Sequence, residues 1–297
     1  MHSVALYCIV QIVSYKLHNT NVLYEEAAMI LDDLAAATRA RVARKKENIA
    51  IEEVRERALQ LAGGAGKEGS FSFPFEKAIA KDGISFICEV KKASPSKGII
   101  AEEFPYLDIA RDYEKAGADC ISVLTETDYF KGDDRFLREI NDVVSIPTIR
   151  KDFIIDTYMI YEAKLLGASS VLLIAALLDT DTIREYKALC DALGLSALVE
   201  AHDEAEVQSA LDAGARMIGV NNRDLKTFTV DISNSIRLRS LVPPDVLFVA
   251  ESGIRTAEDI QALCRAGVNG VLIGETLMRS GDKAAMLRQL KSGDKSI

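Results

Sequence analysis

The sequence predicts an α/β fold, a (β/α)8 or TIM barrel with extra N-terminal helices. From about residue 84, eight short apolar runs rich in β-branched residues alternate with longer amphipathic stretches. This alternation implies parallel strands joined by right-handed crossovers, and a continuous apolar run such as "SVLLIA" implies burial on both faces. A doubly wound open sheet is the structural alternative. Eight evenly spaced units, with no Gly-x-Gly-x-x-Gly after the first run, favour the barrel.

Three helices are expected before the first strand, over residues 30–48, 50–62 and 73–80, with a loop at 63–72. They are expected to pack on the barrel, or else only to close its bottom. No linker is long enough for a second domain, so we expect residues 29–297 to form one barrel domain that includes the N-terminal helices of 29–80. The tail 291–297 is expected to be a frayed end.

The barrel itself is expected to start at the run "ISFICEVK". Several of the stretches between runs end in Gly-Ala or Ala-Gly, where glycine suits a left-handed helix cap and a short loop. The eight predicted strands are 84–91, 120–125, 146–151, 170–175, 196–200, 217–221, 246–251 and 270–275. Helices are expected at 106–118, 157–168, 182–194, 205–215 and 257–268.

Residues 1–28 are expected to be an extension outside this domain. Their apolar stretch of about 12 residues is too short to span a bilayer, and it has neither a preceding basic residue nor a small-residue cleavage motif. A well-patterned helix begins only at Met29. One hypothesis is therefore that translation naturally starts at Met29, which a peptide from residues 1–28 in the native protein would contradict.

Composition narrows the possible ligands. A net charge of −9 argues against a surface for nucleic acid or anionic lipid, so an anionic ligand must be captured by local donors. Five widely spaced cysteines without a Cys-x-x-Cys pair suit reduced thiols in a cytoplasmic protein, and neither a disulfide framework nor a zinc site. The sequence has only three histidines, which leaves almost no residues for a histidine-based metal site or for Ser-His-Asp catalysis.

Charged residues recur at the ends of the predicted strands, where such barrels carry their chemistry. Glu89 and Lys91 lie two apart in the first strand and so face the same way, and Lys151 and Glu200 end two others. If all four face the barrel interior, they form one acid–base cluster, in which a lysine beside another cation or in a dry pocket loses its proton more readily. Stabilising ion pairs at the barrel rim are the alternative.

Two loops suggest a phosphate ligand, and a third suggests a lid. "ESGI" and "IGET" place glycines directly after the last two strands, where backbone N–H groups can cradle a phosphate without a net positive charge nearby. The loop "KKASPSKGII" after the first strand could be a mobile lid carrying Ser94, Ser96 and Lys97 over a substrate. A plain solvated loop is the other interpretation.

These motifs together resemble a known family. The motifs are "CEVKKASPSKG", "SVLTETDYFKG", "IRKDFIID", "ASSVLLIAALL", "LVEAHDEAE", "IGVNNRDLKTF", "VAESGI" and "LIGETLMR". Together they are similar to the indole-3-glycerol-phosphate synthases, and the resemblance runs from about Met29 to Arg279. The resemblance implies ring closure of 1-(2-carboxyphenylamino)-1-deoxyribulose 5-phosphate to indole-3-glycerol phosphate, with loss of carbon dioxide and water. It implies no cofactor or metal, a small-molecule substrate as the only partner, and a monomer or homodimer.

The resemblance also implies roles for the charged residues. Lys151 would be the general acid that protonates the ribulose carbonyl, and Glu200 a second catalytic carboxylate that acts as base or stabilises the cationic intermediate. Lys91, oriented by Glu89, would be the other catalytic pair. The sequence leaves open which lysine serves which step.

The remaining expected site residues come from the same resemblance. Substrate hydroxyl and carboxylate groups would be bound by Asn221, Arg223 and Ser94. Apolar walls for the anthranilate ring would be Phe130, Phe153 and Leu172, of which Leu172 alone would be read as core. The phosphate cradle would be Gly253 and Gly274 with Ser252 beside it, and it would tolerate Glu275 only if that side chain turns away. Glu251 would be a supporting charge near the lysines.

The sequence leaves three alternative functions to consider. Another phosphate-binding barrel enzyme, such as phosphoribosylanthranilate isomerase, would have no reason for this set of lysines and glutamates with a carboxylate-binding loop. A catalytically silent phosphosugar-binding protein could lose the lysines, yet Lys91 and Lys151 are present. An interaction module would have only the N-terminal helices as its surface.

Overall fold

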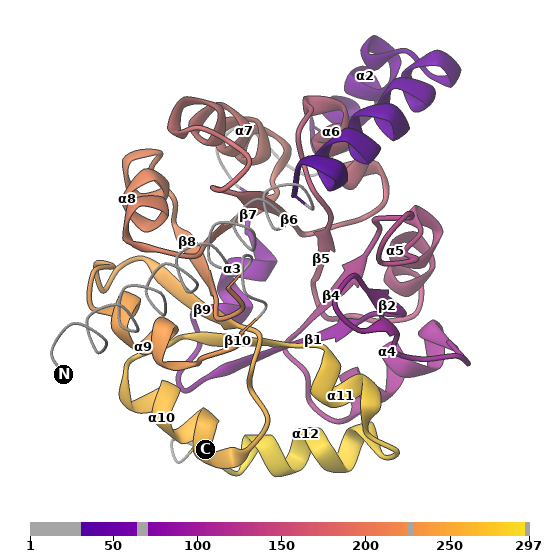
Figure 1. The fold of residues 1–297 in the computed structure, drawn as a ribbon. Coiled ribbons are helices and arrows are strands. Elements are labelled where there is room, and N and C mark those ends of the chain that lie inside the picture. Colours follow the sequence, from indigo (N-terminus) through magenta and orange to yellow (C-terminus); the bar gives the residue numbers. More distant parts are fainter. Residues whose placement is uncertain (1–30, 64–70, 225–228, 295–297) are drawn as a thin grey trace, which may run out of the picture.

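The computed structural model describes residues 31–63, 71–224 and 229–294, and within these ranges eight parallel strands close into a barrel (Figure 1). The predicted (β/α)8 barrel is therefore confirmed. The extension 1–28 and most of the loop expected at 63–72 lie outside the described residues, and the Met29 start stays a prediction. The barrel strands are β1 (Ser85–Val90), β4 (Cys120–Leu124), β5 (Thr148–Lys151), β6 (Ser170–Ile174), β7 (Ser196–Ala201), β8 (Met217–Asn221), β9 (Leu247–Glu251) and β10 (Gly270–Ile273).

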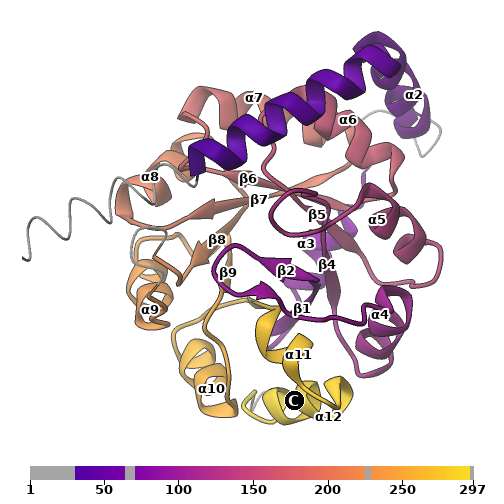
Figure 2. The same cartoon turned by 45° about the vertical axis from the view of Figure 1, so that its right-hand side comes forward.

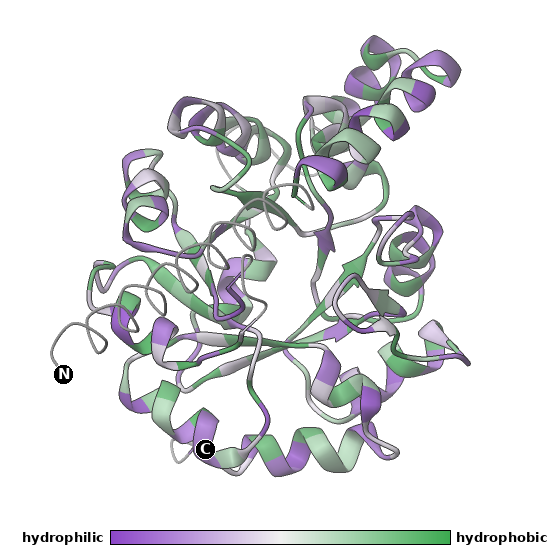
Figure 3. Ribbon diagram, viewed as in Figure 1, coloured by the Kyte–Doolittle hydropathy of each residue, from purple (hydrophilic) through white to green (hydrophobic). Residues whose placement is uncertain are grey.

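Strand neighbours follow chain order, and β1 closes the ring against both β4 and β10. Each barrel strand lies inside one of the eight predicted runs or extends it by one residue. Figure 3 shows mostly hydrophobic strands inside a ring of helices that mix hydrophobic and hydrophilic residues. These helices are α4 (Tyr106–Lys115), α5 (Asp134–Asn141), α6 (Thr157–Leu165), α7 (Thr180–Leu193), α8 (Glu204–Asp212), α9 (Ser233–Arg239), α10 (Ala257–Arg265), α11 (Glu275–Arg279) and α12 (Lys283–Lys291).

Local sequence explains where many of these helices begin and end. The residue before α5 is Asp133, whose carboxylate accepts the N–H of Arg135, and aspartates cap α6, α7, α8 and α12 in the same way. Thr256 and Asp259 form a reciprocal capping box at the start of α10. At the end of α7, Gly194 adopts the left-handed conformation (φ 69°) that was expected of a glycine cap.

The N-terminal end of the barrel is closed by α3 (Pro74–Ile79). Phe75 and Ile79 of this helix are fully buried and belong to the same apolar cluster as the inward-facing strand residues Ile87, Ile149 and Leu198. Closing the bottom, which the sequence analysis considered for all three N-terminal helices, is therefore the role of α3 alone.

The first two helices lie elsewhere. Residues 31–48 form a long helix, seen in indigo across the helix ring in Figure 2, and α2 (Ile51–Gly63) packs on α6 and α7. Lys45 pairs with Asp134 and Glu162, and Lys46 pairs with Asp156 at 2.6 Å. These contacts hold the long helix over the carboxyl-terminal end of the barrel.

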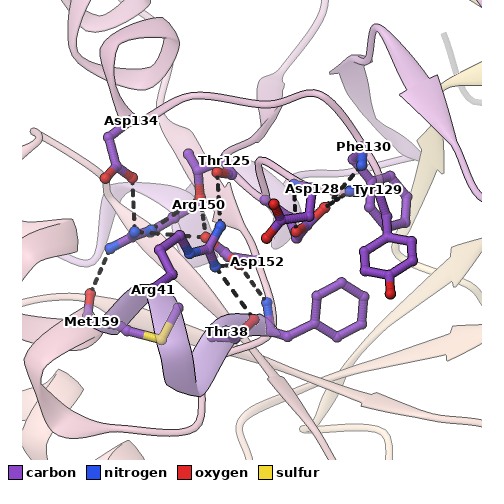
Figure 4. A network of polar contacts seen from close by, with 12 residues as sticks. Thr38, Arg41, Thr125, Asp128, Tyr129, Phe130, Asp134, Arg150, Asp152 and Met159 are labelled. Carbon is purple, nitrogen blue, oxygen red and sulfur yellow. Dashed lines mark hydrogen bonds and ion pairs between the residues drawn. The ribbon is translucent and has the colours of Figure 1, made fainter. Parts of the chain in front are cut away.

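A buried arginine fixes this helix to the barrel strands (Figure 4). Arg41 Nη2 lies 2.6 Å from Asp152 Oδ1, and its Nη1 donates to the carbonyl oxygen of Thr125 at 3.3 Å. Asp152 also accepts the hydroxyl of Thr125 at 2.6 Å, and Arg150 Nη2 bonds Asp134 at 2.8 Å. The long helix is thus joined to the ends of β4 and β5 through groups removed from water.

The expectation of a frayed tail is wrong for residues 291–294. Asp294 is 5% exposed, and its carboxylate accepts the backbone N–H of Ile84 at 2.8 Å, just before β1. No helix in the described ranges is long and apolar enough to cross a membrane.

Replacing Arg41 tests how strongly the long helix is held. In Arg41→Met the buried carboxylate of Asp152 loses its closest cation, so we expect the free energy of unfolding to fall by about 2–4 kcal/mol. Lys46→Met breaks a partly exposed pair and should cost less than about 1 kcal/mol. Denaturant unfolding at one temperature measures both, and equal losses would contradict the special role of Arg41.

Candidate active site

A cavity of about 480 Å³ opens at the carboxyl-terminal ends of the strands. Its wall contains every residue that the sequence analysis placed in a site, although these residues come from all eight strands or the loops that follow them. The predicted residues on this wall are Glu89, Lys91, Ser94, Phe130, Lys151, Phe153, Leu172, Glu200, Asn221, Arg223, Glu251, Ser252, Gly253, Gly274 and Glu275.

The charged residues form the layer of the barrel interior next to the cavity. Two residues before Glu89, Lys151, Glu200 and Glu251 stand Ile87, Ile149, Leu198 and Val249, all of them in the apolar interior cluster. Because strand side chains alternate in direction, each charged residue faces inward directly above an apolar one. The apolar layer excludes water from beneath the charges.

Lys151 is the centre of this layer. Its Nζ lies 3.1 Å from Glu200 Oε2 and 3.6 Å from Glu251 Oε2. Burial opposes its charge, but the carboxylates of Glu200 and Glu89, together with Glu251 when it is ionised, outweigh burial and raise the pKa of Lys151 above its ordinary value. Lys151 is therefore protonated before substrate binds.

The two carboxyl groups beside Lys151 differ in protonation. Burial favours the acid form of Glu200, but Lys151 and His202 outweigh it and lower the pKa of Glu200 below its usual range. Burial, only partly offset by Lys151, raises the pKa of Glu251 to about 8. Glu251 Oε1 is buried without a hydrogen-bond partner among the described residues, and a methyl group at Gly219 would overlap it. The site thus holds one carboxylate and one carboxylic acid around a single ammonium at neutral pH.

Glu89 and Lys91, at the end of β1, form a second ion pair at the barrel mouth. Lys91 Nζ lies 2.5 Å from Glu89 Oε1, and the hydroxyl of Ser122 donates to Glu89 Oε2 at 3.3 Å. Gly274 faces this pair so closely that a methyl group there would overlap both Glu89 Oε1 and Lys91 Nζ. Gly274 therefore leaves room for the charged pair as well as for a ligand.

An aromatic wall borders the charged layer. The rings of Phe130 and Phe153 lie 6.0 Å apart between centroids, and Leu172 joins them on the cavity wall. The loop carrying Phe130 is fixed by Glu126, whose carboxylate accepts the backbone N–H groups of Asp128, Tyr129 and Phe130 at 2.7–2.8 Å (Figure 4). The wall is therefore built before a ligand arrives, and it suits a flat apolar ring.

The loop after β1 is more ordered than the sequence suggested. It contains a two-stranded antiparallel hairpin, β2 (Ala93–Ser94) with β3 (Gly98–Ile99), and Ser94 and Ser96 lie on the cavity wall. Lys97 at its turn lies 4.0 Å from Glu275. The hairpin covers the cavity mouth, and its mobility stays a prediction.

The glycine loops lie at the end of the cavity near β9 and β10. Ser252 and Gly253 both have positive φ angles (66° and 82°), and this backbone turns the loop after β9 along the wall. Glu275 does not face an anion site unopposed, because it lies 3.0 Å from Arg279 Nε and 3.8 Å from Arg223 Nη2. Nearby cations thus compensate the charge of Glu275, the one acid that the sequence places beside the expected phosphate cradle.

Several wall residues escaped the sequence analysis. Arg255 and Arg279 add cations at the glycine-loop end, and Arg279 is the last residue of the motif "LIGETLMR" that was quoted for its glycine. Leu31 and Leu34 come from the helix over 31–48, and only an amphipathic pattern, shared with ordinary packing helices, marked them. The remaining unpredicted wall residues are Pro95, Leu124, Asp152, Ile174, Val230, Ile254, Leu272, Ile273 and Thr276.

Comparisons with known proteins show the family of this chain. The family model described as indole-3-glycerol phosphate synthase matches residues 31–290. The chain belongs to the indole-3-glycerol phosphate synthase family. The synthase of Ruminiclostridium cellulolyticum is 59% identical over 263 residues, which cover 89% of this chain and 99% of that protein. Those of Endomicrobium trichonymphae and Lachnoclostridium phytofermentans are 52% and 50% identical, each covering 89% of this chain and at least 99% of the relative.

Solved structures share the barrel fold of this chain. The crystal structure of a 3-hexulose-6-phosphate synthase matches with a TM-score of 0.59 at 14% identity, over 71% of this chain and 99% of that chain. A thiamine phosphate pyrophosphorylase from Pyrococcus furiosus matches with a TM-score of 0.53 at 15% identity. At such identities the likeness shows the shared fold alone.

Gly274→Ala tests the space beside the Glu89–Lys91 pair. The φ angle of Gly274 is −113°, so alanine adds no backbone strain, but its methyl group displaces both charged groups. We expect kcat/KM to fall about 100-fold or more while the chain still folds. The control is Gly281→Ala, since nothing lies within 4 Å of a methyl group at that position. Equal activity of the two variants would contradict this interpretation.

Glu251→Gln tests the protonation of the second carboxyl. The pKa of Glu251 is about 8 in the folded state and near 4.5 when unfolded, so the wild type loses stability as pH rises through this interval. The variant lacks this loss. Its free energy of unfolding relative to the wild type should therefore increase by up to about 1.4 kcal/mol per pH unit from pH 4.5 to 8 and then level off. Denaturant unfolding across this range measures the difference, and a constant difference would contradict the raised pKa.

Proposed function

We propose that this chain closes the indole ring of indole-3-glycerol phosphate from 1-(2-carboxyphenylamino)-1-deoxyribulose 5-phosphate, releasing carbon dioxide and water. The observation that carries this proposal is the position of Lys151. A protonated lysine stands between a carboxylate and a carboxylic acid at the floor of the cavity, next to an aromatic wall. Such a site offers a proton to a carbonyl oxygen and a negative charge to the cation formed with it.

The cavity offers a separate place for each part of this substrate. Backbone N–H groups around Gly253 and Gly274, with Arg279 nearby, suit the phosphate. Phe130, Phe153 and Leu172 suit the anthranilate ring, and Arg223 with Ser94 suits its carboxylate. Held in this way, the ring carbon that bears the carboxylate lies next to the ribulose carbonyl, as carbon–carbon bond formation requires.

In the first step that ring carbon attacks the carbonyl carbon, and Lys151 transfers its proton to the carbonyl oxygen, which becomes a hydroxyl. The ring and its nitrogen now carry a positive charge, which the carboxylate of Glu200 stabilises. The bond to the carboxylate carbon then breaks, and its electron pair restores the aromatic ring as carbon dioxide leaves.

Dehydration completes the product. We assign Lys91 as the acid that protonates the departing hydroxyl, because it is a second ammonium group on the cavity wall and is paired with its own carboxylate, Glu89. Water leaves, and a carboxylate of the site removes a proton from the neighbouring ring carbon to form the indole. Two protons are donated and one is recovered, so each turnover draws one proton from solvent.

The family assignment does not favour the alternatives of a phosphoribosylanthranilate isomerase or a silent binding protein. Homologues of this kind are carboxy-lyases of tryptophan biosynthesis that act on a small molecule. A location in the cytoplasm, the absence of nucleic-acid partners and a monomeric or dimeric state stay predictions.

Indole fluorescence on mixing chain and substrate tests the reaction directly, because the chain has no tryptophan. We expect the signal to rise with the wild type and its rate to fall about 10²–10⁴-fold in Lys151→Met, which keeps the apolar stem but has no proton to donate. Lys115→Met, on the exposed face of α4, is the control. No rise with the wild type despite bound substrate would contradict the proposed function. Full activity of Lys151→Met would contradict only the role of that lysine.

A further inference from the structure

His202 lies directly behind Glu200, outside the cavity wall. It follows β7 two residues after Glu200, and its side chain is 12% exposed. Its Nε2 lies 3.4 Å from Glu200 Oε1 and makes no hydrogen bond to any residue that the structure describes, while its Nδ1 lies 2.9 Å from Glu206 Oε2. Each ring nitrogen therefore faces a different carboxylate.

This geometry has a chemical consequence. A carboxylate only accepts hydrogen bonds, so a nitrogen that faces one is best satisfied when it carries a proton. A neutral imidazole has one such N–H, whereas the imidazolium has two. Two carboxylates on opposite sides of one ring therefore favour the positively charged form.

The ring cannot easily turn away from this arrangement. Glu206, in the first turn of α8, accepts the backbone N–H of His202 at 2.8 Å. The same carboxylate oxygen lies 2.9 Å from Nδ1 of the ring. The amide of Asn234 on α9 donates to the carbonyl oxygen of His202 at 3.0 Å. Both bonds fix the residue from the side remote from the cavity, so Nε2 is held toward Glu200.

We propose that His202 is a positively charged positioning residue that keeps the catalytic carboxylate of Glu200 ionised and in place while Lys151 gives up its proton. This role rests on the proposed function. The two oxygens of Glu200 have separate partners: Oε2 faces Lys151, whereas Oε1 faces His202 and accepts the amide of Asn221 at 3.3 Å.

The charge of His202 matters most after the first proton transfer. Lys151 is then neutral, and Glu200 has lost the cation 3.1 Å away. Without a second cation, its buried carboxylate would gain a proton more readily and could no longer stabilise the cationic ring. His202 keeps its charge throughout, because the carboxylates of Glu200 and Glu206 outweigh burial and raise its pKa to about 10. Among charged groups, Glu200 and Glu206 lie against it, and Glu251 and Lys151 lie beyond Glu200.

The experiment compares the wild type with His202→Gln, Glu206→Gln and Glu204→Gln. The last is the control, because it removes an exposed carboxylate that lies on α8 like Glu206 but pairs with Arg237 of α9. We expect His202→Gln to lower kcat about 10–100-fold with KM changed less than about 3-fold, because the lost interaction acts in the chemical steps. The acid limb of kcat/KM should move to higher pH, because His202 is one of the groups that lower the pKa of Glu200. Glu206→Gln should show the same changes to a smaller degree, and Glu204→Gln neither.

A second measurement reads the charge of His202 without turnover. In proton–carbon NMR spectra, the imidazole signal that disappears in His202→Gln belongs to His202, and it should stay that of an imidazolium up to pH 8. A signal that titrates near pH 6.5 would overturn the proposal while leaving the proposed function intact. Unchanged kcat and pH profiles in His202→Gln and Glu206→Gln would also overturn it. If only one of these two variants folds, the result for that variant decides. A wild type without activity would instead overturn the proposed function, and with it a role for His202 in turnover.

Discussion

The parallel direction of all eight strands is the constraint on which the rest of the structure depends. Because every strand ends at the same rim, inward-facing residues from β1, β5, β7 and β9 meet there although they are far apart in sequence. Charges gathered in this way are costly to bury, and each is tolerated only because an opposite charge lies beside it. Lys151 shows this directly, since its nearest carboxyl groups, those of Glu200 and Glu251, come from two other strands. The ion pairs of the rim thus make burial of these charges possible, and they also supply the acidic and basic groups of the site.

Strand β5 separates two charge networks by the direction of its side chains. Lys151 and Phe153 face the cavity, whereas Arg150 points outward to Asp134 and Glu162. Arg150 is 1% exposed, yet its charge is compensated outside the barrel and does not compete for the carboxylates around Lys151. Asp152, one residue further, holds Arg41 and with it the helix that brings Leu31 and Leu34 to the cavity. A single short strand therefore positions both the acid and part of the wall above it.

The strands and the rim were predictable because their signals are local. Alternation within a strand shows which residues share a face, and parallel closure then brings the faces together. The Arg41–Asp152 pair spans 111 positions, and nothing near either residue marks the other as its partner. His202 was counted only as one of few histidines, because its role depends on a carboxylate from the following helix. Pairing of β2 with β3 and the burial of Asp294 likewise depend on contacts that only the folded chain brings together.

The two carboxyl groups beside Lys151 show how different neighbours give similar groups different protonation states. Both lie within 3.6 Å of the same ammonium, yet the pKa of Glu200 is lowered and that of Glu251 is raised. Glu200 has His202 and Asn221 on its second oxygen, whereas the second oxygen of Glu251 faces Gly219 without a hydrogen bond in the described part of the chain. A protonated Glu251 removes one of the negative charges that raise the pKa of Lys151. Lys151 can then release its proton more readily than three ionised carboxylates would permit, while Glu200 stays charged to meet the cation that forms.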